Sequence, residues 1–260
     1  MRAKVPDEPN RPASPRRASL PGVKIGVLGA TGPAGKAVSV QFAGVGHEVL
    51  VGSRALDRAE ETVSALRERW KGRNLRLLPA DNDTAASADL VIVATPWEGI
   101  ISTVTALEAK LAGKIVISMA NALTKWGKEM VPLLPPTGSV AVAVARALPG
   151  ARVVGAFHHL PAGPWGDLDH DLDADVMVCS DDHDAAEETV ALIDTLPGLR
   201  GVNSGGLSSA LAIEALTPAL LEVNRHYKVH AAIRITGLPD RGSGDGRASD
   251  SREQAPASGG

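Results

Sequence analysis

Three glycines spaced three residues apart form the clearest candidate for ligand binding in this chain. They directly follow the apolar run at residues 24–28 and precede a segment with helical periodicity. Glycine lets the backbone turn sharply and approach a pyrophosphate, and the free N–H groups of the next helix bind its charge. The residues of this turn that we expect to hold a dinucleotide are Gly29, Thr31, Gly32, Pro33, Ala34 and Gly35. The spacing differs from the GxGxxG of the NAD fingerprint, and the alternative is a turn that binds nothing.

The residues after the second expected strand indicate which dinucleotide is preferred. An NAD-binding chain usually places an acidic residue about 20 positions beyond the first glycine, where it binds the ribose 2′-hydroxyl. This chain has Ser53 and Arg54 there, and Arg58 follows four residues later. A carboxylate would repel a 2′-phosphate, whereas a hydroxyl and a guanidinium bind it through charge-assisted hydrogen bonds. The pattern predicts an NADP(H) site, with solvated positions at a helix start as the alternative for the arginines.

A further group of candidate binding residues follows the fourth expected strand. Ligands of open α/β sheets lie at the carboxyl ends of the strands, and Thr95, Pro96 and Trp97 stand at such an end. A rigid Pro-Trp pair there would wall one side of the nicotinamide or adenine pocket. Ordinary packing is the other interpretation of Trp97.

The sequence lacks the acid–base pair of a short-chain dehydrogenase. That class needs a tyrosine with a lysine four residues later, but the only tyrosine, Tyr227, has Ala231 at that spacing. Reductases of imines or 2-oxoacids use a Lys or His as general acid. The residues available for that role are Lys125, Lys128, His158 and His159. No pattern assigns it to any of them, and a structural or pocket-lining role is the simpler interpretation of the adjacent histidines.

Composition argues against several other kinds of partner. Cys179 is the only cysteine, which rules out an intramolecular disulfide and a cysteine-rich metal site and suits a reducing cytoplasm. The formal net charge is −3, although residues 1–22 alone carry five basic and two acidic side chains. The segment between the two tails is therefore acidic, which disfavours nucleic-acid binding. No apolar run approaches the roughly 20 residues of a membrane span. Together these features predict a cytoplasmic protein with no metal, nucleic-acid or membrane partner.

Short apolar runs alternate with longer helical periodicities, as a parallel sheet with crossover helices requires. The expected strands are residues 24–28, 48–52, 75–78, 89–94, 114–118, 152–157 and 175–179. The expected helices are residues 33–43, 57–70, 98–111, 139–147, 185–196 and 208–227. We expect Thr217-Pro218 to interrupt the last helix because proline removes a backbone donor. The pattern predicts an α/β fold, with a Rossmann-type doubly wound parallel sheet and a smaller C-terminal α/β domain.

Four segments are expected along the chain. Residues 1–22 and 239–260 are rich in Pro, Gly, Ser and charged side chains, so we expect a disordered arm and tail. Residues 23–154 are expected to form the NADP-binding Rossmann domain. Residues 155–238 are expected to form the smaller domain, with the boundary near Gly155.

Several motifs in register resemble one family, the NADPH-dependent coenzyme F420 reductases, or F420H2:NADP oxidoreductases. Together they cover nearly everything between Val23 and Leu238. The matching motifs are the glycine turn, Gly46-His-Glu-Val, Val51-Gly-Ser-Arg54, Thr95-Pro-Trp-Glu98, His158 with Pro161-Ala162, Leu207-Ser208 and Glu214-Ala-Leu-Thr-Pro218. The glycine turn occurs in many dinucleotide-binding proteins. The combination of Val-Gly-Ser-Arg with Pro-Trp-Glu is specific for this family, and Leu-Thr-Pro is more specific still.

The resemblance implies a hydride that passes directly between C4 of the nicotinamide and C5 of the deazaflavin F420. Such a transfer needs stacked rings and no catalytic acid or base from the protein. The 2′-phosphate would be held by Thr31, Ser53, Arg54 and Arg58, with Pro96 and Trp97 beside the nicotinamide. The deazaflavin slot would be lined by Ala120, Asn121, His158, Pro161 and Leu207. The smaller domain would complete this slot and form a homodimer.

Two alternatives remain open from the sequence. The first is another NADP-dependent reductase, acting on a small imine or ketoacid. The second is a non-catalytic protein that senses NADP(H).

The chain departs from the family pattern at one position. Some relatives carry a histidine where this chain has Gly99, so any contact made by that imidazole is absent here.

Overall fold

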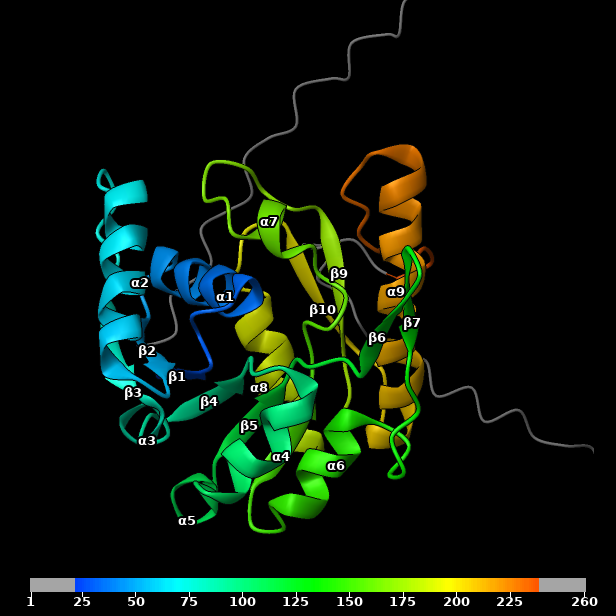
Figure 1. Ribbon diagram of the computed structural model, residues 1–260, viewed down its shortest axis with the longest axis horizontal. Helices are drawn as coiled ribbons and strands as arrows, with labels where there is room; N and C mark the ends of the chain where they lie inside the picture. Colours follow the sequence, from blue (N-terminus) through cyan, green and yellow to red (C-terminus); the bar gives the residue numbers. More distant parts are fainter. Residues whose placement is uncertain (1–21, 239–260) are drawn as a thin grey trace, which may run out of the picture.

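The computed structural model describes residues 22–238, which are built around a six-stranded parallel sheet (Figure 1). The strand order is β3-β2-β1-β4-β5-β8, the doubly wound order of a Rossmann fold. The strands are β1 (Lys24–Leu28), β2 (Glu48–Ser53), β3 (Leu77–Asp81), β4 (Leu90–Val93), β5 (Ile115–Ser118) and β8 (Arg152–Gly155). The predicted fold class is confirmed. Apart from residue 22, the predicted arm and tail lie outside the described residues.

Helices cover both faces of this sheet because its strands alternate apolar side chains between two cores. Ile25 and Val27 of β1 belong to one cluster with α1 (Pro33–Gly44) and α2 (Leu56–Arg69). Leu28 belongs to the other cluster, which contains side chains of the helices on the second face. Those helices are α3 (Asn82–Ala85), α4 (Trp97–Thr105), α5 (Glu108–Leu111) and α6 (Val140–Ala147).

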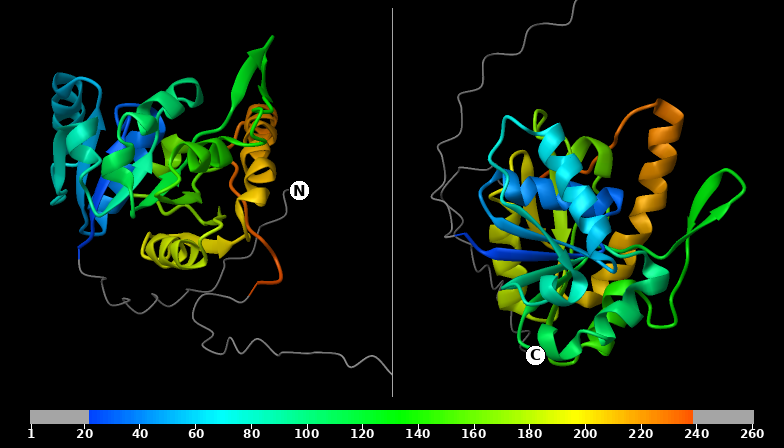
Figure 2. Two further views of the ribbon diagram at one scale, coloured as in Figure 1. Left: turned by 90° about the horizontal axis from the view of Figure 1, so that it is seen from below. Right: turned by 60° about the vertical axis from the view of Figure 1, so that its left-hand side comes forward.

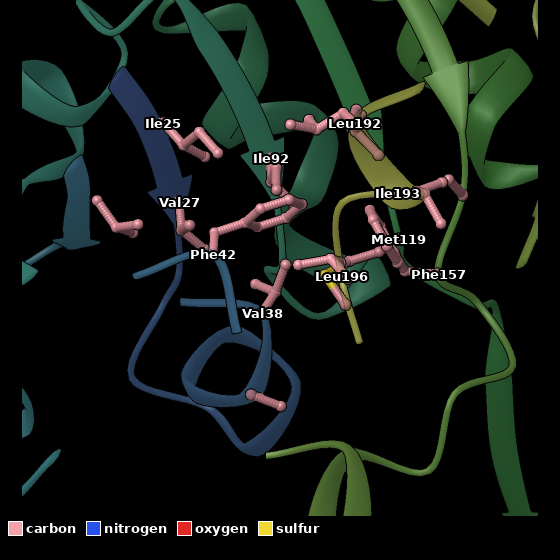
Figure 3. Close-up of a cluster of buried hydrophobic side chains, with 14 of the residues drawn as sticks. Ile25, Val27, Val38, Phe42, Ile92, Met119, Phe157, Leu192, Ile193 and Leu196 are labelled. Carbon is pink, nitrogen blue, oxygen red and sulfur yellow. The ribbon is translucent and has the colours of Figure 1, made fainter. Parts of the chain in front are cut away.

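The C-terminal part begins where β8 ends. Gly155 and Cys179 form an antiparallel bridge, with N–O distances of 2.8 and 3.0 Å. The elements that follow are α7 (Ala162–Trp165), β9 (Ala174–Val178), α8 (His183–Ile193), β10 (Leu199–Asn203), the 3₁₀ turn η1 (Leu207–Ser209) and α9 (Ala210–Tyr227). The first core cluster continues across position 155, because Phe42 and Phe157 pack there with Leu192 and Ile193 (Figure 3). The division of the chain near Gly155 stays a prediction.

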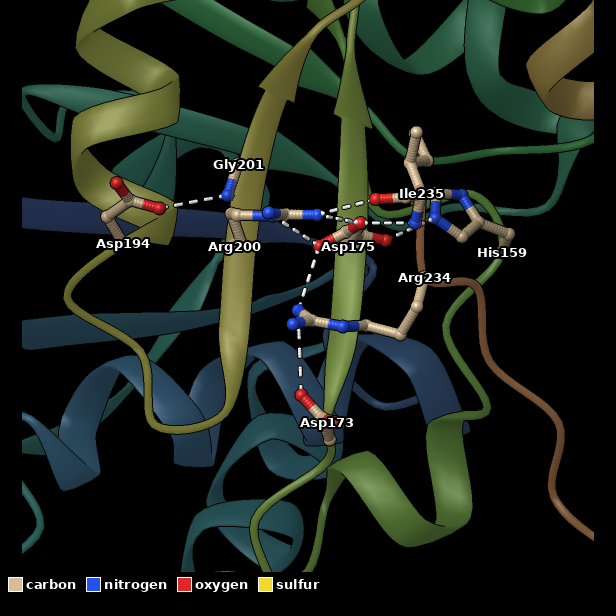
Figure 4. Close-up of polar contacts among 8 residues, drawn as sticks. All are labelled: His159, Asp173, Asp175, Asp194, Arg200, Gly201, Arg234 and Ile235. Atoms are coloured by element: carbon tan, nitrogen blue, oxygen red, sulfur yellow. Dashed lines mark hydrogen bonds and ion pairs between the residues drawn. The ribbon is translucent and has the colours of Figure 1, made fainter. Parts of the chain in front are cut away.

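A buried carboxylate connects the end of the described chain to β9. Asp175 is fully buried and accepts hydrogen bonds of 2.7 and 2.6 Å from Arg200 on β10. It also accepts bonds from Arg234 at 3.0 Å and from the N–H of Ile235 at 2.6 Å (Figure 4). Burial raises the pKa of Asp175, but these donors outweigh it and hold the pKa below its usual value. The carboxylate is therefore charged and joins three segments.

Several elements differ from those expected. The third strand begins two residues later and ends three residues later than predicted, because Leu77 pairs with Val49 of β2. The helix predicted at residues 98–111 is divided into α4 and α5. The structure adds β10 and an exposed hairpin of β6 (Leu123–Trp126) and β7 (Glu129–Pro132) (Figure 2). Among the described residues no helix is long and apolar enough to span a membrane, and no His, Cys, Asp and Glu cluster suits a metal.

The predicted interruption at Pro218 is wrong. The helix α9 runs without a break from Ala210 to Tyr227 and contains Pro218. Proline costs a helix one hydrogen bond, but here its ring is buried. The preceding turn is anchored as well, because the Glu214 carboxylate accepts the N–H groups of Val140 and Ala141, each at 2.9 Å. Tertiary contacts therefore support the helix on the N-terminal side of the proline.

Candidate active site

A cavity of about 740 Å³ lies at the carboxyl ends of β1, β2, β4 and β5. Five segments distant in sequence line it: the glycine turn, the start of α2, Asn82 after β3, the residues from Ala94 to Thr103, and the stretch after β5. Most of the predicted site residues lie on its wall. These are Gly29, Thr31, Gly32, Pro33, Ala34, Ser53, Arg54, Arg58, Thr95, Pro96, Trp97, Ala120 and Asn121.

The glycine turn is packed too closely for side chains at two of its positions. Gly29 has a φ of +71°, and a Cβ there would lie 2.6 Å from Cγ2 of Thr95. A Cβ on Gly35 would lie 2.6 Å from the Cα of Ala30. Gly35 is absent from the cavity wall, so its part in the turn is to let α1 approach the strand end. Asn82 supports the turn by accepting the N–H of Gly29 at 3.4 Å.

The polar groups on this side of the cavity suit phosphates. The first turn of α1 has no side-chain cap at Gly32 and no acidic residue, so its N–H groups and positive helix end remain available to an anion. Ser53 is buried at the end of β2, and the exposed Arg54 and Arg58 stand at the start of α2. Among the described residues that line the cavity these arginines are the only charged side chains. The wall therefore carries positive charge where a pyrophosphate and a 2′-phosphate would lie.

The cavity wall also presents buried polar atoms that have no hydrogen-bond partner among the described residues. These atoms are Oγ1 of Thr95, Nε1 of Trp97 and Oδ1 of Asn121, and all three residues line the wall. Buried polar atoms in native proteins are usually hydrogen-bonded, so such a group points to a ligand. Nε1 of Trp97 is a donor, Oδ1 of Asn121 is an acceptor, and the Thr95 hydroxyl can be either. Such a set matches the donors and acceptors on the edge of a nicotinamide or deazaflavin ring. The residues present thus fit both groups.

None of the four side chains considered as general acids is suited to that role. Lys125 and Lys128 are exposed on the hairpin and do not line the cavity. His158 is 3% exposed, and burial together with the neighbouring His159 lowers its pKa to about 3. The ring of His159 lies 2.9 Å from the carbonyl oxygen of Asp175, and burial lowers its pKa too. Both imidazoles are neutral at pH 7, so neither supplies a proton readily.

Sequence and structure comparisons identify the relatives of this chain. The family described as "NADP oxidoreductase coenzyme F420-dependent" matches residues 24–122. The F420-dependent NADP reductase of Methanocaldococcus jannaschii is 36% identical over 222 residues, covering 83% of this chain and 99% of that protein. The chain belongs to the F420-dependent NADP reductase family. The protein of the same name from Methanothermobacter thermautotrophicus is 33% identical over 225 residues, covering 84% of this chain and 97% of that protein.

A crystal structure agrees with this assignment. A protein of Arthrobacter sp. FB24 described as an F420-dependent NADP reductase is 28% identical and has a TM-score of 0.70. The similarity covers 82% of this chain and all of that chain. Every residue that lines the cavity, apart from Leu123, falls inside the stretch matched to the F420-dependent NADP reductase family. The matched stretch therefore contains almost the whole cavity wall.

The predicted deazaflavin residues of this F420-dependent NADP reductase are only partly brought together. Ala120 and Asn121 line the cavity, and Asn121 Nδ2 donates to the carbonyl of His158 at 2.9 Å. The side chains of His158, Pro161 and Leu207 are not on the cavity wall. Leu207 belongs to a separate buried cluster with Cys179 and Ile213. The roles of these three residues stay predictions.

Sequence reasoning missed a second group of lining residues. These are Ala55, Asn82, Ala94, Gly99, Ser102, Thr103, Met119 and Leu123. Gly99, Ser102 and Thr103 share one face of α4 at the i, i+3, i+4 spacing, which a helical projection from Trp97 would have revealed. A Cβ on Gly99 would meet no atom within 4 Å, so the cavity is open there. Asn82 follows β3 at the same sheet edge, the position where ligand contacts are expected.

Proposed function

We propose that this protein transfers a hydride directly between NADPH and F420, giving NADP⁺ and reduced F420 with uptake of one proton. One observation carries the proposal: a single cavity joins an arginine pair and an uncapped helix end to three unpartnered polar atoms. The first part suits NADP(H), and the second suits the ring systems that must meet. Membership of the F420-dependent NADP reductase family supports the same pairing.

The protein's contribution is binding and orientation. Arg54, Arg58 and Ser53 would hold the 2′-phosphate, with Thr31 beside them, and the first turn of α1 would hold the pyrophosphate. Thr95, Pro96 and Trp97 would fix the nicotinamide ring. Asn121 would offer its free Oδ1 to an N–H of the opposing ring. Hydride transfer requires the two reacting carbons within about 3–3.5 Å, which is a matter of placement.

No acid or base from the protein is assigned to the hydride step. The bound coenzymes supply the electron chemistry, since the nicotinamide gives or takes the hydride and the deazaflavin is its partner. His158 is neutral over the physiological range because of its buried position. Its function would be to shape the slot beside Asn121. The same argument applies to Pro161 and Leu207, which we place on the deazaflavin side by resemblance.

The deciding experiment mixes the purified protein with NADPH and oxidised F420 and follows the deazaflavin absorbance. We expect loss of the oxidised F420 absorbance in proportion to NADPH consumed. Turnover of a cyclic imine or a ketoacid in the absence of F420 would favour the other reductase. NADPH binding without turnover of any of these would favour a sensor. NADH in place of NADPH serves as the control for the role of Arg54.

We also infer a homodimer formed through α9 and the β6–β7 hairpin. Large apolar side chains are exposed on these neighbouring elements, with Trp126 78% and Tyr227 68% exposed, and Leu134, two residues after β7, is 71% exposed. Leu221 and Val223 add two more, each 38% exposed. A second copy of the chain would cover this surface. Light scattering on the protein and on Leu221→Arg tests this, with a shift from dimer to monomer expected.

We also propose a cytoplasmic location, based on the single cysteine.

A further inference from the structure

One backbone oxygen, the carbonyl of His158, joins the wall of the cavity to the middle of α9. It accepts a hydrogen bond from Nδ2 of Asn121 at 2.9 Å and a second from Oγ1 of Thr217 at 2.8 Å. Asn121 follows β5 and lines the cavity, whereas Thr217 does not. The two side chains therefore meet only through this acceptor.

The hydroxyl of Thr217 is directed away from its own helix. A threonine inside a helix commonly donates to the carbonyl four residues earlier, as Thr189 does to Ala185 at 2.7 Å in α8. Thr217 instead donates to a different segment. The buried Glu214 carboxylate, which accepts two N–H groups at the start of α6, fixes the same turn of α9. This anchor gives the hydroxyl a defined position relative to the sheet.

The segment that carries the acceptor has a strained backbone. Phe157 has a φ of +65°, an uncommon value for a bulky side chain. Its ring stacks on Trp165 with 5.3 Å between ring centres and meets Phe42 edge-on at 6.2 Å. Such a conformation persists only where surrounding contacts hold it. The two hydrogen bonds to the next residue, His158, are among those contacts.

Asn121 is oriented by the same oxygen. Its Nδ2 is taken by the His158 carbonyl, which leaves the buried Oδ1 as an acceptor with no protein partner on the cavity wall. A displacement of the His158 carbonyl would carry the Asn121 amide with it. The effect of Thr217 on the site thus passes through one backbone group to one amide.

We propose that Thr217 is a positioning residue for F420, acting through the His158 carbonyl on Asn121; this rests on the proposed function. The Leu216-Thr217-Pro218 motif then has a defined purpose in this chain. Thr217 supplies a donor from the middle of a helix to the deazaflavin side of the cavity, while Asn121 provides the contact itself. The residues proposed to hold NADP(H) do not include Asn121 or Thr217, so we expect NADP(H) affinity to be independent of Thr217.

The test compares Thr217→Val, which keeps the shape but loses the donor, with Thr217→Ser, which keeps the donor. Thr195→Val is the matched control, since Thr195, two residues beyond α8, donates to the Leu192 carbonyl at 2.7 Å and is not on the cavity wall. Equilibrium Kd values for F420 and for NADPH are measured separately by titration, together with KM, kcat and Tm. Loss of one neutral hydrogen bond corresponds to a change of roughly 3- to 10-fold.

We expect Thr217→Val to raise the Kd and the KM for F420 by that factor while the Kd for NADPH stays within about twofold. Thr217→Ser should restore F420 binding, and Thr195→Val should lower Tm at most. An unchanged F420 Kd in folded Thr217→Val, equal weakening of both ligands, or no rescue by serine would overturn the proposal. Thr217→Ala gives the same comparison if the valine variant does not fold. Failure of the unmodified protein to reduce F420 would instead refute the proposed function.

Discussion

Ser53 and Asp81 lie directly opposite each other in the parallel register of β2 and β3, yet only Ser53 lines the cavity. The Asp81 carboxylate caps α3 by accepting the N–H of Thr84 at 2.7 Å. That hydrogen bond holds the pKa of Asp81 below its usual value. The acid paired with Ser53 in the sheet is therefore engaged in the fold, and Arg54 and Arg58 determine the charge of the cavity wall.

Arg54→Ala should weaken NADP(H) binding and leave NAD(H) binding almost unchanged. We expect the guanidinium to bind the 2′-phosphate, which NAD(H) lacks, and a hydrogen bond to a charged group contributes about 1.5–3 kcal/mol. Titration calorimetry with both cofactors measures the difference. Arg146→Ala, at an exposed arginine of α6 outside the cavity, is the control and should change neither value. Equal losses for NADP(H) and NAD(H) would contradict the assignment.

Deuterium at the transferable C4 position of NADPH should appear at C5 of reduced F420 without dilution by solvent. The reason is that direct transfer between stacked rings never releases the hydride to water. Mass spectrometry or NMR of the reduced deazaflavin gives the isotope content. The same reaction run with unlabelled NADPH in D₂O is the control and should leave the transferred position unlabelled. Washout of label into water would count against direct transfer.

Stability should fall as the pH is lowered from 7 to 5, in part through His158. Its pKa is about 3 in the folded protein and 6.5 in the unfolded chain. Below pH 6.5 the unfolded state binds a proton that the folded state does not, so this stability is present above pH 6.5 and lost toward pH 3. The loss at pH 5 amounts to roughly 2 kcal/mol. Urea unfolding at pH 7, 6 and 5 measures it.

His158→Gln tests whether this histidine is the source of that pH dependence. The variant should be less stable at pH 7 but should lose less stability between pH 7 and pH 5. His159, whose pKa burial also lowers, would remain and account for part of the slope. An identical slope in both proteins would show that His158 does not titrate in this way.

Asp175→Asn should destabilise the fold strongly without changing cofactor affinity. It would remove the carboxylate charge that pairs with the buried Arg200 guanidinium, and breaking a buried ion pair costs about 3–5 kcal/mol. Asp173→Asn is the matched control, because Asp173 is 75% exposed and lies 3.5 Å from Arg234. An exposed pair contributes about 1 kcal/mol or less. Thermal unfolding and NADPH titration of both variants separate the two effects.

The parts of the fold that follow from apolar periodicity were predictable, and those set by pairing between segments were not. β1 and α1 begin where the sequence indicated, because a buried run and a proline at a helix start leave little choice. β10 was missed because Arg200 and Gly201 interrupt its apolar pattern. Arg200 is acceptable in that strand because Asp175 neutralises it. The hairpin was missed since each of its strands has only four residues, mixes polar with apolar side chains and buries none of them.

Several residues of the cavity wall were predictable for a chemical reason. Gly29 was expected because a tight turn needs glycine, and Ser53 and Arg54 because a hydroxyl and a cation suit a phosphate. All three line the cavity. The deazaflavin end depends on contacts between residues far apart in the chain. Thr217 and His158 are 59 positions apart and meet through a backbone oxygen, which leaves no trace in local sequence.

The cluster around Asp175 determines where the chain tolerates truncation and fusion. The N–H of Asp175 donates to the carbonyl of Ile233, and its carboxylate accepts from Arg234 and Ile235. A truncation that removes residues 233–235 would uncover the edge of β9. Of the three donors to the Asp175 carboxylate, only Arg200 would remain. An affinity tag joined after Leu238 keeps these contacts. Expression boundaries for this protein should therefore be chosen beyond Ile235.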